Sequence, residues 1–300
     1  MIKISSLVSE TLLYAKPIVA LESALITHGL PFPENYHLAK ELESIVKDAG
    51  AVPATIAVLD GDFIIGVDEG ELLRLAEDKN FHKISSRELS VAEELHWSGG
   101  TTVAGTLTLA FKVGIKIIAT GGIGGVHRNA PFDISADLPQ LSKTPLLVVC
   151  AGAKSILDLP ATIEYLETWS VPILGYKTSL FPSFFSISSG LFTMAEVESA
   201  AQIARIAVSH WRFGFASSIL VTVPPPKESA LPDDLIEKII DQAVAEAESQ
   251  NIRGQAITPF LLKRVNELSS GDSMRTNLSL LRNNVRIAAE IAVELSNIKL

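Results

Sequence analysis

Lys154 is the residue of this sequence whose position most strongly suggests chemistry. It follows an apolar run, Leu146 to Cys150, and a turn of small residues, Ala151-Gly152-Ala153. Turns that follow strands are where open α/β sheets bind ligands. A lysine is a nucleophile when its amine is uncharged, which burial and a nearby cation favour. The alternative is a surface lysine in the first turn of a helix, since the sequence predicts a helix that begins at Lys154. A cation is mildly unfavourable at that end of a helix.

Glu22 is the second candidate for chemistry. It ends the run P-I-V-A-L-E, which has the character of a buried strand. A carboxyl group in that place is expected to lose its water, which raises its pKa and suits it to donate a proton near neutral pH. The alternative is that Glu22 pairs with an arginine or caps a backbone turn. His28, a few residues later, contacts a substrate or is a buried histidine with its own partner.

A glycine-rich loop lies between these two candidates. Gly121-Gly122-Ile123-Gly124-Gly125 lacks the spacing of a dinucleotide fingerprint. Consecutive glycines do let backbone N–H groups converge on an anion, and His127 and Arg128 follow directly. Phosphate or sugar binding and a plain tight turn are therefore both open.

Further polar residues could bind a ligand. Asp133 and Asp137 could share a hard cation, because carboxylate oxygens with several waters suit Mg²⁺ or Mn²⁺. Alternatively, one of these acids caps a short helix from Ser135 to Leu141. Lys83 is a candidate cation for a phosphate, or else a solvated lysine.

Composition excludes several classes of protein. The chain has 300 residues, 47% of them hydrophobic, and a formal net charge of −9. An acidic chain without a basic cluster is a poor candidate for binding duplex nucleic acid. The one cysteine, Cys150, cannot form an intramolecular disulfide and is expected to be buried. No uncharged apolar run is long enough to cross a membrane.

The two ends of the sequence bear on localisation. The N-terminus lacks the apolar core of a signal peptide, so a cytoplasmic protein is expected. The C-terminal Ile298-Lys299-Leu300 differs from the peroxisomal Ser-Lys-Leu signal at its first position, and this leaves the peroxisome as an alternative.

Short apolar runs alternate with amphipathic segments, which predicts a layered α/β/α fold with a mostly parallel central sheet, in one domain over residues 1–300. Asp60-Gly61 predicts a local antiparallel hairpin. The predicted strands are Ile18–Leu21, Thr55–Leu59, Phe63–Gly66, Lys116–Ala119, Leu146–Cys150, Val171–Tyr176 and Ile219–Val223. The predicted helices are Glu34–Ala49, Glu69–Ala76, Thr101–Val113, Lys154–Thr168, Ala195–Ser209, Pro232–Ser249, Pro259–Leu268 and Met274–Leu295.

Taken together, these motifs resemble the pseudouridine-5′-phosphate glycosidase family. The resemblance covers nearly the whole chain, in long ungapped runs. The matching runs are Val19 to Asn35, Gly50 to Gly61, Gly99 to Leu107, Ala119 to Arg128, Phe132 to Leu138, Val148 to Asp158, Ile257 to Leu262 and Thr276 to Asn284.

The resemblance implies a homotrimeric enzyme with one Mn²⁺ per subunit, which reversibly converts pseudouridine 5′-phosphate and water to uracil and ribose 5-phosphate. It implies that Lys154 is the nucleophile, Glu22 the proton donor and Asp133 the metal ligand. The substrate-binding positions that it implies are Lys83, Val103, Ser135, Ala136 and Asp137. Thr102, His127 and Asn277 are further candidates for the same site.

Cleavage of a C–C bond explains why an amine would be needed. Ordinary glycosidases use two carboxylates and protonate an oxygen leaving group. Here the uracil carbon must be protonated, and the sugar carbon needs an electron sink, which a lysine imine supplies after the ribose ring opens. A Schiff-base lyase of aldolase type on another sugar phosphate, and a sugar-phosphate-binding protein without turnover, are the alternatives.

The sequence departs from the family pattern at three positions. Ser86 stands where the family usually has an arginine, Val223 where it has an asparagine, and Ala24 where it has a threonine. None of these departures removes the nucleophile, the acid or the metal ligand. They bear on fine contacts with the substrate.

Overall fold

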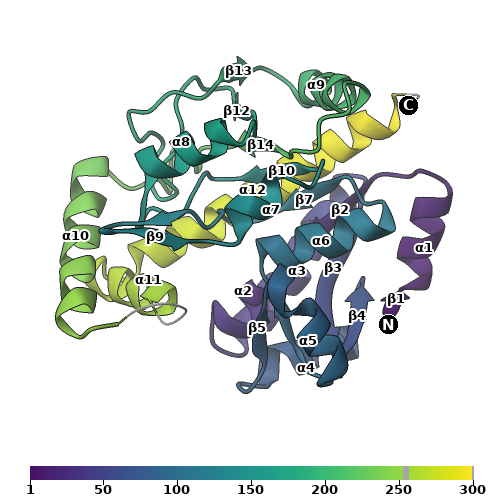
Figure 1. Ribbon diagram of the computed structural model, residues 1–300, viewed down its shortest axis with the longest axis horizontal. Coiled ribbons are helices and arrows are strands. Elements are labelled where there is room, and N and C mark those ends of the chain that lie inside the picture. Colours follow the sequence, from purple (N-terminus) through teal and green to yellow (C-terminus); the bar gives the residue numbers. More distant parts are fainter. Residues whose placement is uncertain (253–256, 299–300) are drawn as a thin grey trace.

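The computed structural model describes residues 1–252 and 257–298. Its main sheet has eleven strands and runs in the order β1-β4-β3-β2-β7-β10-β14-β12-β13, with β6 also beside β3 and β5 beside β6 (Figure 1). The strands are β1 Ile2–Ile4, β2 Ile18–Leu21, β3 Val52–Leu59, β4 Asp62–Ile65, β5 His82–Ile84, β6 Gly99–Thr101, β7 Ile117–Ala119, β10 Leu147–Cys150, β12 Ile173–Tyr176, β13 Ala195–Val197 and β14 Ile219–Thr222.

The strands from β3 to β13 in this order are all parallel. Their apolar runs are buried without alternation, as expected for a parallel sheet covered on both faces. The β3–β4 hairpin is antiparallel, with Asp60 at φ 51° and Gly61 at φ 84°. Two consecutive positive φ values are typical of a tight hairpin turn, and a glycine adopts them without steric cost. The predicted fold class and hairpin are confirmed.

Helices cover both faces of the sheet. Figure 1 shows α6 and α7 in front of the strands and α12 behind them. The helices are α1 Ser6–Leu13, α2 Ala24–His28, α3 Glu34–Asp48, α4 Glu69–Glu77, α5 Leu89–Glu94, α6 Val103–Val113, α7 Asp137–Leu141, α8 Leu159–Thr168, α9 Ala200–Arg212, α10 Asp233–Ser249, α11 Ile257–Leu268 and α12 Asp272–Ser296. None of the helices in the described ranges is long and apolar enough to cross a membrane. Lys299 and Leu300 belong to the C-terminal tripeptide on which the peroxisomal alternative rests, and they lie outside the described residues.

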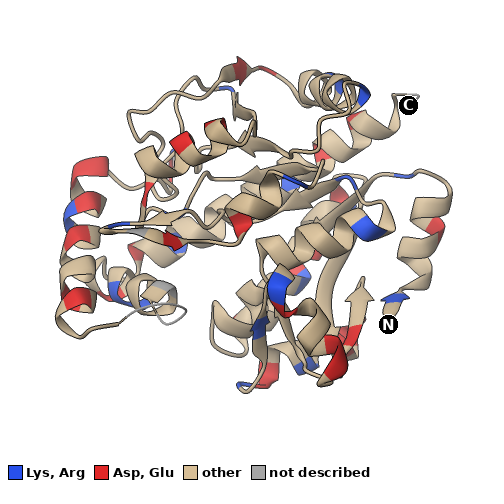
Figure 2. Cartoon of the chain, in the orientation of Figure 1, with Lys and Arg blue, Asp and Glu red and all other residues tan. Residues whose placement is uncertain are grey.

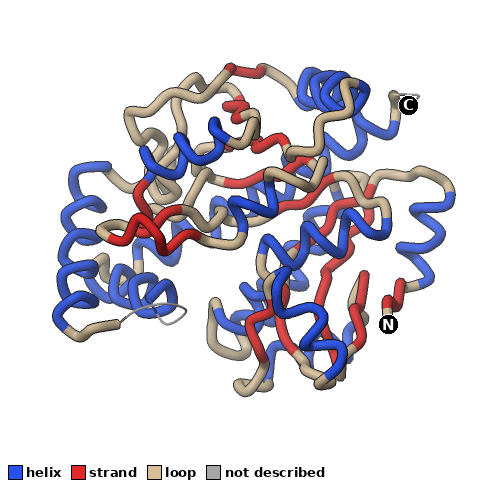
Figure 3. The backbone as a smooth tube through the Cα atoms, viewed as in Figure 1, coloured by secondary structure: helices blue, strands red, loops and turns tan. Residues whose placement is uncertain are grey.

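A second, three-stranded antiparallel sheet was not predicted. It has the order β11-β8-β9 and consists of Val126–His127 (β8), Ala130–Ile134 (β9) and Leu157–Asp158 (β11). Figure 3 shows it beside α10, at one end of the molecule. Strand β11 of this sheet lies between the Lys154 turn and the helix that follows, so the predicted helix from Lys154 to Thr168 is wrong at its start.

Helix α8 begins at Leu159 because the capping residues are there. The Asp158 side chain accepts a hydrogen bond from the Ala161 N–H (3.0 Å), and Pro160 occupies the first turn. An acidic cap followed by proline is a strong helix start. Lys154 therefore lies in a turn and not at the N-terminus of a helix.

The predicted helix from Ala195 to Ser209 is also wrong at its start. Ala195 to Val197 form the edge strand β13, and α9 begins at Ala200, after the cap Ser199. The Ser199 hydroxyl accepts a hydrogen bond from the Gln202 N–H (3.3 Å), which fixes the first turn.

Cys150 is fully buried, as predicted, and burial raises the pKa of its thiol to about 12.

Ser23 joins three strands at the carboxyl end of β2. Its hydroxyl donates to the Ile56 carbonyl (2.6 Å) and accepts from the Thr101 N–H (2.9 Å), and the residue is 0% exposed. We expect Ser23→Ala to lower the free energy of unfolding by about 1–3 kcal/mol, because a buried N–H loses its acceptor. Urea unfolding measures this change.

Ser44→Ala is the matched control for this substitution. Ser44 is exposed on α3 and makes one long hydrogen bond, to Asp48 (3.5 Å). The free energy of unfolding of Ser44→Ala should stay within about 0.5 kcal/mol of the wild-type value. Equal stability of the two variants would show that Ser23 does not hold these strands together.

Candidate active site

The carboxyl ends of β2, β7 and β10 meet at one edge of the sheet. These strands are neighbours, but the chain leaves β2 toward β3 and later returns to β7 on the other side of β2. Such a reversal opens a crevice beyond the strand ends, where α/β proteins bind ligands. Glu22 follows β2, Thr120 follows β7, and the turn with Lys154 follows β10. The topology therefore brings together the two residues from which the sequence predicts chemistry.

Glu22 is half-buried at this crevice. The Thr120 hydroxyl donates a hydrogen bond to Glu22 Oε1. Burial raises the pKa of the Glu22 carboxyl; the charge of Lys154 and the Thr120 hydrogen bond oppose this rise, and the Asp137 carboxylate adds to it. Glu22 thus has the desolvated carboxyl expected from the sequence. Sequence reasoning missed Thr120, although it follows its strand just as Glu22 does.

Two lysines share the space around Glu22. Burial lowers the pKa of Lys83, and the charge of Lys154 lowers it further, while Asp137 and Glu22 oppose the change. Lys154 is half-buried, and its N–H donates to the Ile123 carbonyl (3.1 Å). No carboxylate of the described residues lies within 4.0 Å of the Lys154 amine. Neither lysine is the solvated surface residue of the alternative reading.

Asp137 holds the glycine-rich loop against α6. Its two carboxylate oxygens accept hydrogen bonds from the N–H groups of Ala104 (2.9 Å) and Gly124 (2.8 Å), and the residue is 7% exposed. A side chain on Gly124 would collide with Ser135, so glycine is needed there for close approach. The Ile123 N–H donates to Gly152 (3.0 Å). These N–H groups are used within the protein, which favours the tight turn over an anion cradle formed by this loop.

The start of α6 lies beside Lys83. The Thr102 N–H donates to the Ile84 carbonyl (2.9 Å), and the Thr102 hydroxyl caps the helix by accepting from the Gly105 N–H (3.4 Å). Val103, the first helical residue, is 2% exposed. The N–H groups of the first turn have no acceptor within the helix, and that of Val103 is one of them. Helix N-termini also attract anions. The Ala104 N–H binds Asp137 and the Gly105 N–H binds Thr102, which leaves the Val103 N–H as the candidate donor to a ligand beside Lys83.

The other predicted residues surround the same crevice. Ser135 and Ala136 precede α7, beside Gly124. Asn277 of α12 lies next to Gly121, because a Cβ on that glycine would be 3.6 Å from the Asn277 Oδ1. His28 is exposed, and its Nδ1 lies 2.7 Å from the Thr27 hydroxyl oxygen; partial desolvation and the charge of Lys83 lower its pKa.

Asp133 and His127 form a pair on the small sheet, close enough to Lys154 and Lys83 for the charges of both lysines to act on His127. The distance from His127 Nδ1 to Asp133 Oδ2 is 3.6 Å, and their side chains are 12% and 43% exposed. Burial lowers the pKa of His127, while Asp133 opposes the change. Among the described residues, no group of three His, Cys, Asp or Glu side chains could hold a metal. Each oxygen of Asp137 already accepts a hydrogen bond from a backbone N–H.

A cavity of about 690 Å³ lies on the other side of the Lys154 turn and is lined by Leu157, Asp158 and residues of α10. None of the predicted site residues lines it. Glu22 borders a much smaller gap of about 20 Å³. Arg128 and five carboxylates line the large cavity, but Glu22, Lys83 and Lys154 are not among its lining residues.

A family model described as "Indigoidine synthase A like protein" matches residues 7–294. This chain belongs to that family. Relatives named pseudouridine-5′-phosphate glycosidase are 48% identical in Geobacillus kaustophilus (94% of each chain covered) and 48% identical in Escherichia coli (98% of this chain and 95% of the relative). One from Arabidopsis thaliana is 46% identical over 99% of this chain and 91% of the relative. The family resemblance seen in the sequence is confirmed, and with it that the chain is an enzyme.

Solved structures of this indigoidine synthase A-like family have the same fold. The prealnumycin C-glycosynthase AlnA, in complex with ribulose 5-phosphate, superimposes with a TM-score of 0.92 at 36% identity, over 99% of this chain and 97% of that one. An indigoidine synthase A-like protein from Thermotoga maritima superimposes with a TM-score of 0.90 at 33% identity, with the same coverage.

The raised pKa of Glu22 makes a testable prediction about stability. A carboxyl whose folded-state pKa exceeds its unfolded value of about 4.5 destabilises the fold as it ionises. The wild type therefore loses stability as the pH rises from 4.5 through the folded-state pKa, and Glu22→Gln does not. We expect Glu22→Gln to melt at a higher temperature than the wild type at pH 8, with a difference that shrinks toward pH 4. Calorimetry at both values measures it.

Glu41→Gln is the control. Glu41 pairs with Arg282 on the surface, and this hydrogen bond lowers the pKa of Glu41. Its substitution should lower the melting temperature slightly at neutral pH, which is the opposite of the change expected for Glu22→Gln. If the melting temperature of Glu22→Gln exceeded that of the wild type by less at pH 8 than at pH 4, the result would contradict a raised pKa of Glu22.

Proposed function

We propose that this enzyme reversibly cleaves the C–C glycosidic bond of pseudouridine 5′-phosphate, with water, to give uracil and ribose 5-phosphate. One observation carries the proposal: the Glu22 carboxyl, whose pKa is raised, shares one crevice with Lys83 and Lys154. Relatives named for this activity cover nearly the whole chain. The ribulose 5-phosphate complex of AlnA is consistent with a sugar-phosphate substrate.

Lys154 is the proposed nucleophile. Its amine nitrogen forms a bond to C1′ of the ribose while the C1′–O4′ bond breaks, and the amine proton passes to O4′. The nitrogen lone pair then forms the C1′=N iminium as the C1′–C5 bond breaks. Water hydrolyses the iminium to the aldehyde of ribose 5-phosphate and restores the lysine.

Glu22 is the proposed proton donor. It protonates C5 of the uracil before the C1′–C5 bond breaks, and the carboxylate that remains recovers a proton when the iminium is hydrolysed. A raised pKa keeps this group protonated closer to neutral pH, as a general acid requires. The Thr120 hydroxyl holds the carboxyl across the crevice.

The phosphate is proposed to lie between Lys83 and the N-terminus of α6. Lys83 supplies a cation, Val103 a backbone N–H, and the helix a positive end. Ser135 and Ala136 are proposed to contact the ribose from beside Gly124. Asp137, by its place between Ala104 and Gly124, contributes through the loop that it holds.

Manganese is part of the proposal because the resemblance implies it. The Asp133 carboxylate is a hard oxygen ligand, and its 43% exposure leaves room for the water ligands that Mn²⁺ accepts. We propose that Asp133 holds one Mn²⁺ per subunit, with His127 beside it. When bound, the ion would supply positive charge near the substrate oxygens. A homotrimer, also implied by the resemblance, is proposed as the assembly, and light scattering tests it.

Departures from the family pattern lie near the proposed site. Val223 follows β14, and its N–H donates to the Cys150 carbonyl (2.8 Å) at the start of the Lys154 turn. Ala24 begins α2, two residues after Glu22. Ser86 is in a short 3₁₀ turn after Lys83. These positions affect substrate fit or rate, and the proposed acid and nucleophile remain.

We expect the wild-type enzyme to release uracil from pseudouridine 5′-phosphate, followed by absorbance loss and product identification. Lys154→Ala should abolish turnover without a loss of stability, because Lys154 contributes little to the core. Glu22→Gln should lower kcat by about 10²–10⁴-fold. The exposed Lys143→Ala is the matched control and should keep wild-type rates. Normal turnover in Lys154→Ala would refute the nucleophile assignment.

Borohydride trapping with ribose 5-phosphate identifies the lysine that forms the imine. We expect one adduct, on the peptide that contains Lys154, which persists in Lys83→Met. An adduct on Lys83, the lysine with the lowered pKa, would exchange the two roles. An adduct without uracil release indicates an aldolase-type lyase, and neither adduct nor release indicates a binding protein.

Chelation is expected to lower the activity, and added Mn²⁺ to restore it. Asp133→Asn should weaken Mn²⁺ binding at least tenfold, because the amide loses the charge that attracts the ion. Electron paramagnetic resonance of free Mn²⁺ measures binding independently of turnover. Asp48→Asn, on the exposed face of α3, is the control. Unchanged affinity in Asp133→Asn, or full activity in excess chelator, would remove Asp133 or the metal from the proposal.

A further inference from the structure

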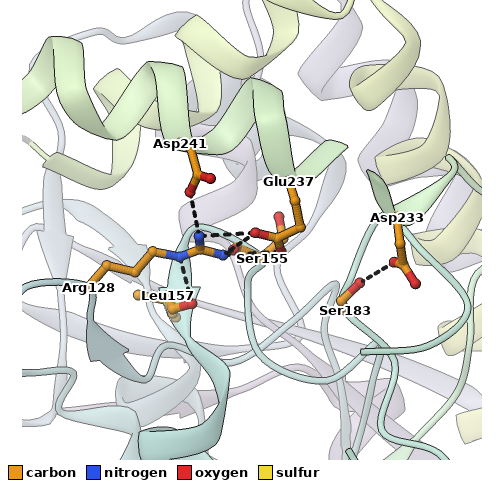
Figure 4. Close-up of polar contacts among 7 residues, drawn as sticks. All are labelled: Arg128, Ser155, Leu157, Ser183, Asp233, Glu237 and Asp241. Atoms are coloured by element: carbon orange, nitrogen blue, oxygen red, sulfur yellow. Dashed lines mark hydrogen bonds and ion pairs between the residues drawn. The ribbon is translucent and has the colours of Figure 1, made fainter. Parts of the chain in front are cut away.

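Arg128 lies in the two-residue turn between β8 and β9, on the hairpin that carries His127 and Asp133. Its side chain is 21% exposed. In the sequence it follows the glycine-rich loop, for which anion binding and a tight turn are both open. The structure instead directs the guanidinium between the Lys154 turn and helix α10, as Figure 4 shows.

Arg128 donates two hydrogen bonds to the chain segment that follows Lys154. Its Nη2 donates to the Ser155 carbonyl (2.9 Å) and its Nε to the Leu157 carbonyl (3.2 Å). Ser155 and Leu157 are each 2% exposed. Buried carbonyls need a donor, and here one side chain supplies both, from the outer side of the turn.

Two carboxylates of α10 hold the guanidinium in this place. Glu237 and Asp241 are four residues apart, so they lie on one face of the helix. Arg128 Nη1 lies 3.1 Å from Glu237 Oε2 and 3.1 Å from Asp241 Oδ1, and Nη2 also donates to Glu237 (3.1 Å). Figure 2 shows the acidic residues of α10 along this helix. The planar fork of arginine makes these contacts and the two carbonyl contacts at once, which a lysine cannot do.

The inner side of the turn is held by the glycine-rich loop. The Lys154 N–H donates to the Ile123 carbonyl (3.1 Å), and the Leu157 N–H donates back to the Lys154 carbonyl (3.0 Å). Strand β11 pairs with β8 at Leu157 and His127. The backbone around Lys154 is thus fixed from inside by the sheet and from outside by Arg128.

We infer that Arg128, held by Glu237 and Asp241, is a positioning residue for the Lys154 amine. The inference rests on the proposed function, in which Lys154 attacks C1′. It adds that helix α10, which contributes no predicted site residue, determines where that amine lies. Misplacement of a reacting group by about 1 Å can cost about 10²-fold in rate. Loss of the contact therefore lowers kcat more than it raises KM.

The test compares Arg128→Lys with Arg264→Met. Arg264 is the matched control, because it binds Glu246 of α10 (3.0 Å) and Glu267 of α11 (2.9 Å) but has no hydrogen bond to the Lys154 turn. Arg128→Lys should lower kcat roughly 10–100-fold, with KM within about threefold of the wild type. Glu237→Gln should give a smaller loss in the same direction, and Arg264→Met should keep kcat within about twofold.

Hydrogen exchange of the Lys154 and Leu157 amides is the second readout. Arg128→Lys should speed their exchange at least tenfold, while Arg264→Met should leave these two amides protected and act on α10 and α11. Wild-type kcat in Arg128→Lys would overturn the inference. An equal loss of kcat in Arg264→Met, or unchanged exchange at Lys154 and Leu157, would do so as well.

The two readouts separate this inference from the proposed function. If the wild-type enzyme releases no uracil and forms no imine, the proposed function fails. Exchange at the two amides then decides whether Arg128 positions the turn. If the wild type is active and Arg128→Lys is equally active, the proposed function stands and the positioning role fails.

Discussion

The Asp137 carboxylate joins the loop after β7 to the first turn of α6, at the point where the sheet topology reverses. A buried carboxylate is costly unless hydrogen bonds satisfy it, and here two backbone N–H groups do so. Because both donors belong to segments that border the crevice, the distance between those segments is set by the size of one carboxylate. The glycine at position 124 is required for the same reason, since a side chain there would displace Ser135.

The same carboxylate acts on the titratable groups of the site. Burial is the main cause of the raised pKa of Glu22 and of the lowered pKa of Lys83, and Asp137 adds to the first and opposes the second. The charge of Lys154 acts on both groups as well, since it lowers the pKa of the Glu22 carboxyl and the pKa of the Lys83 amine. Glu22 and Lys83 therefore titrate under the influence of the same two neighbours, Asp137 and Lys154.

The sequence predicted those parts of the structure that depend on continuous burial. Strands β2, β7, β10 and β14 are apolar along their whole length because helices cover both faces, and Glu22 and Lys154 follow two of these runs. The small sheet was missed because β8 and β11 have two residues each, too few for a periodic pattern. Lys154 was placed at a helix start because a small-residue turn precedes it, whereas the capping aspartate comes four residues later.

Contacts distant in the sequence were out of reach of any local pattern. Asp137 was a candidate for substrate or metal because its motif says nothing of Ala104, 33 residues away. Arg128 follows a loop for which phosphate binding and a tight turn were both open, and its partner Glu237 lies 109 residues further along the chain. In both cases the side chain holds backbone in place rather than meeting solvent. In the proposed mechanism the Lys154 amine must reach C1′ of the ribose, so the placement of its backbone affects the rate. Lys154 has no close carboxylate partner among the described residues to orient its side chain, so its position depends on the backbone that these two residues fix.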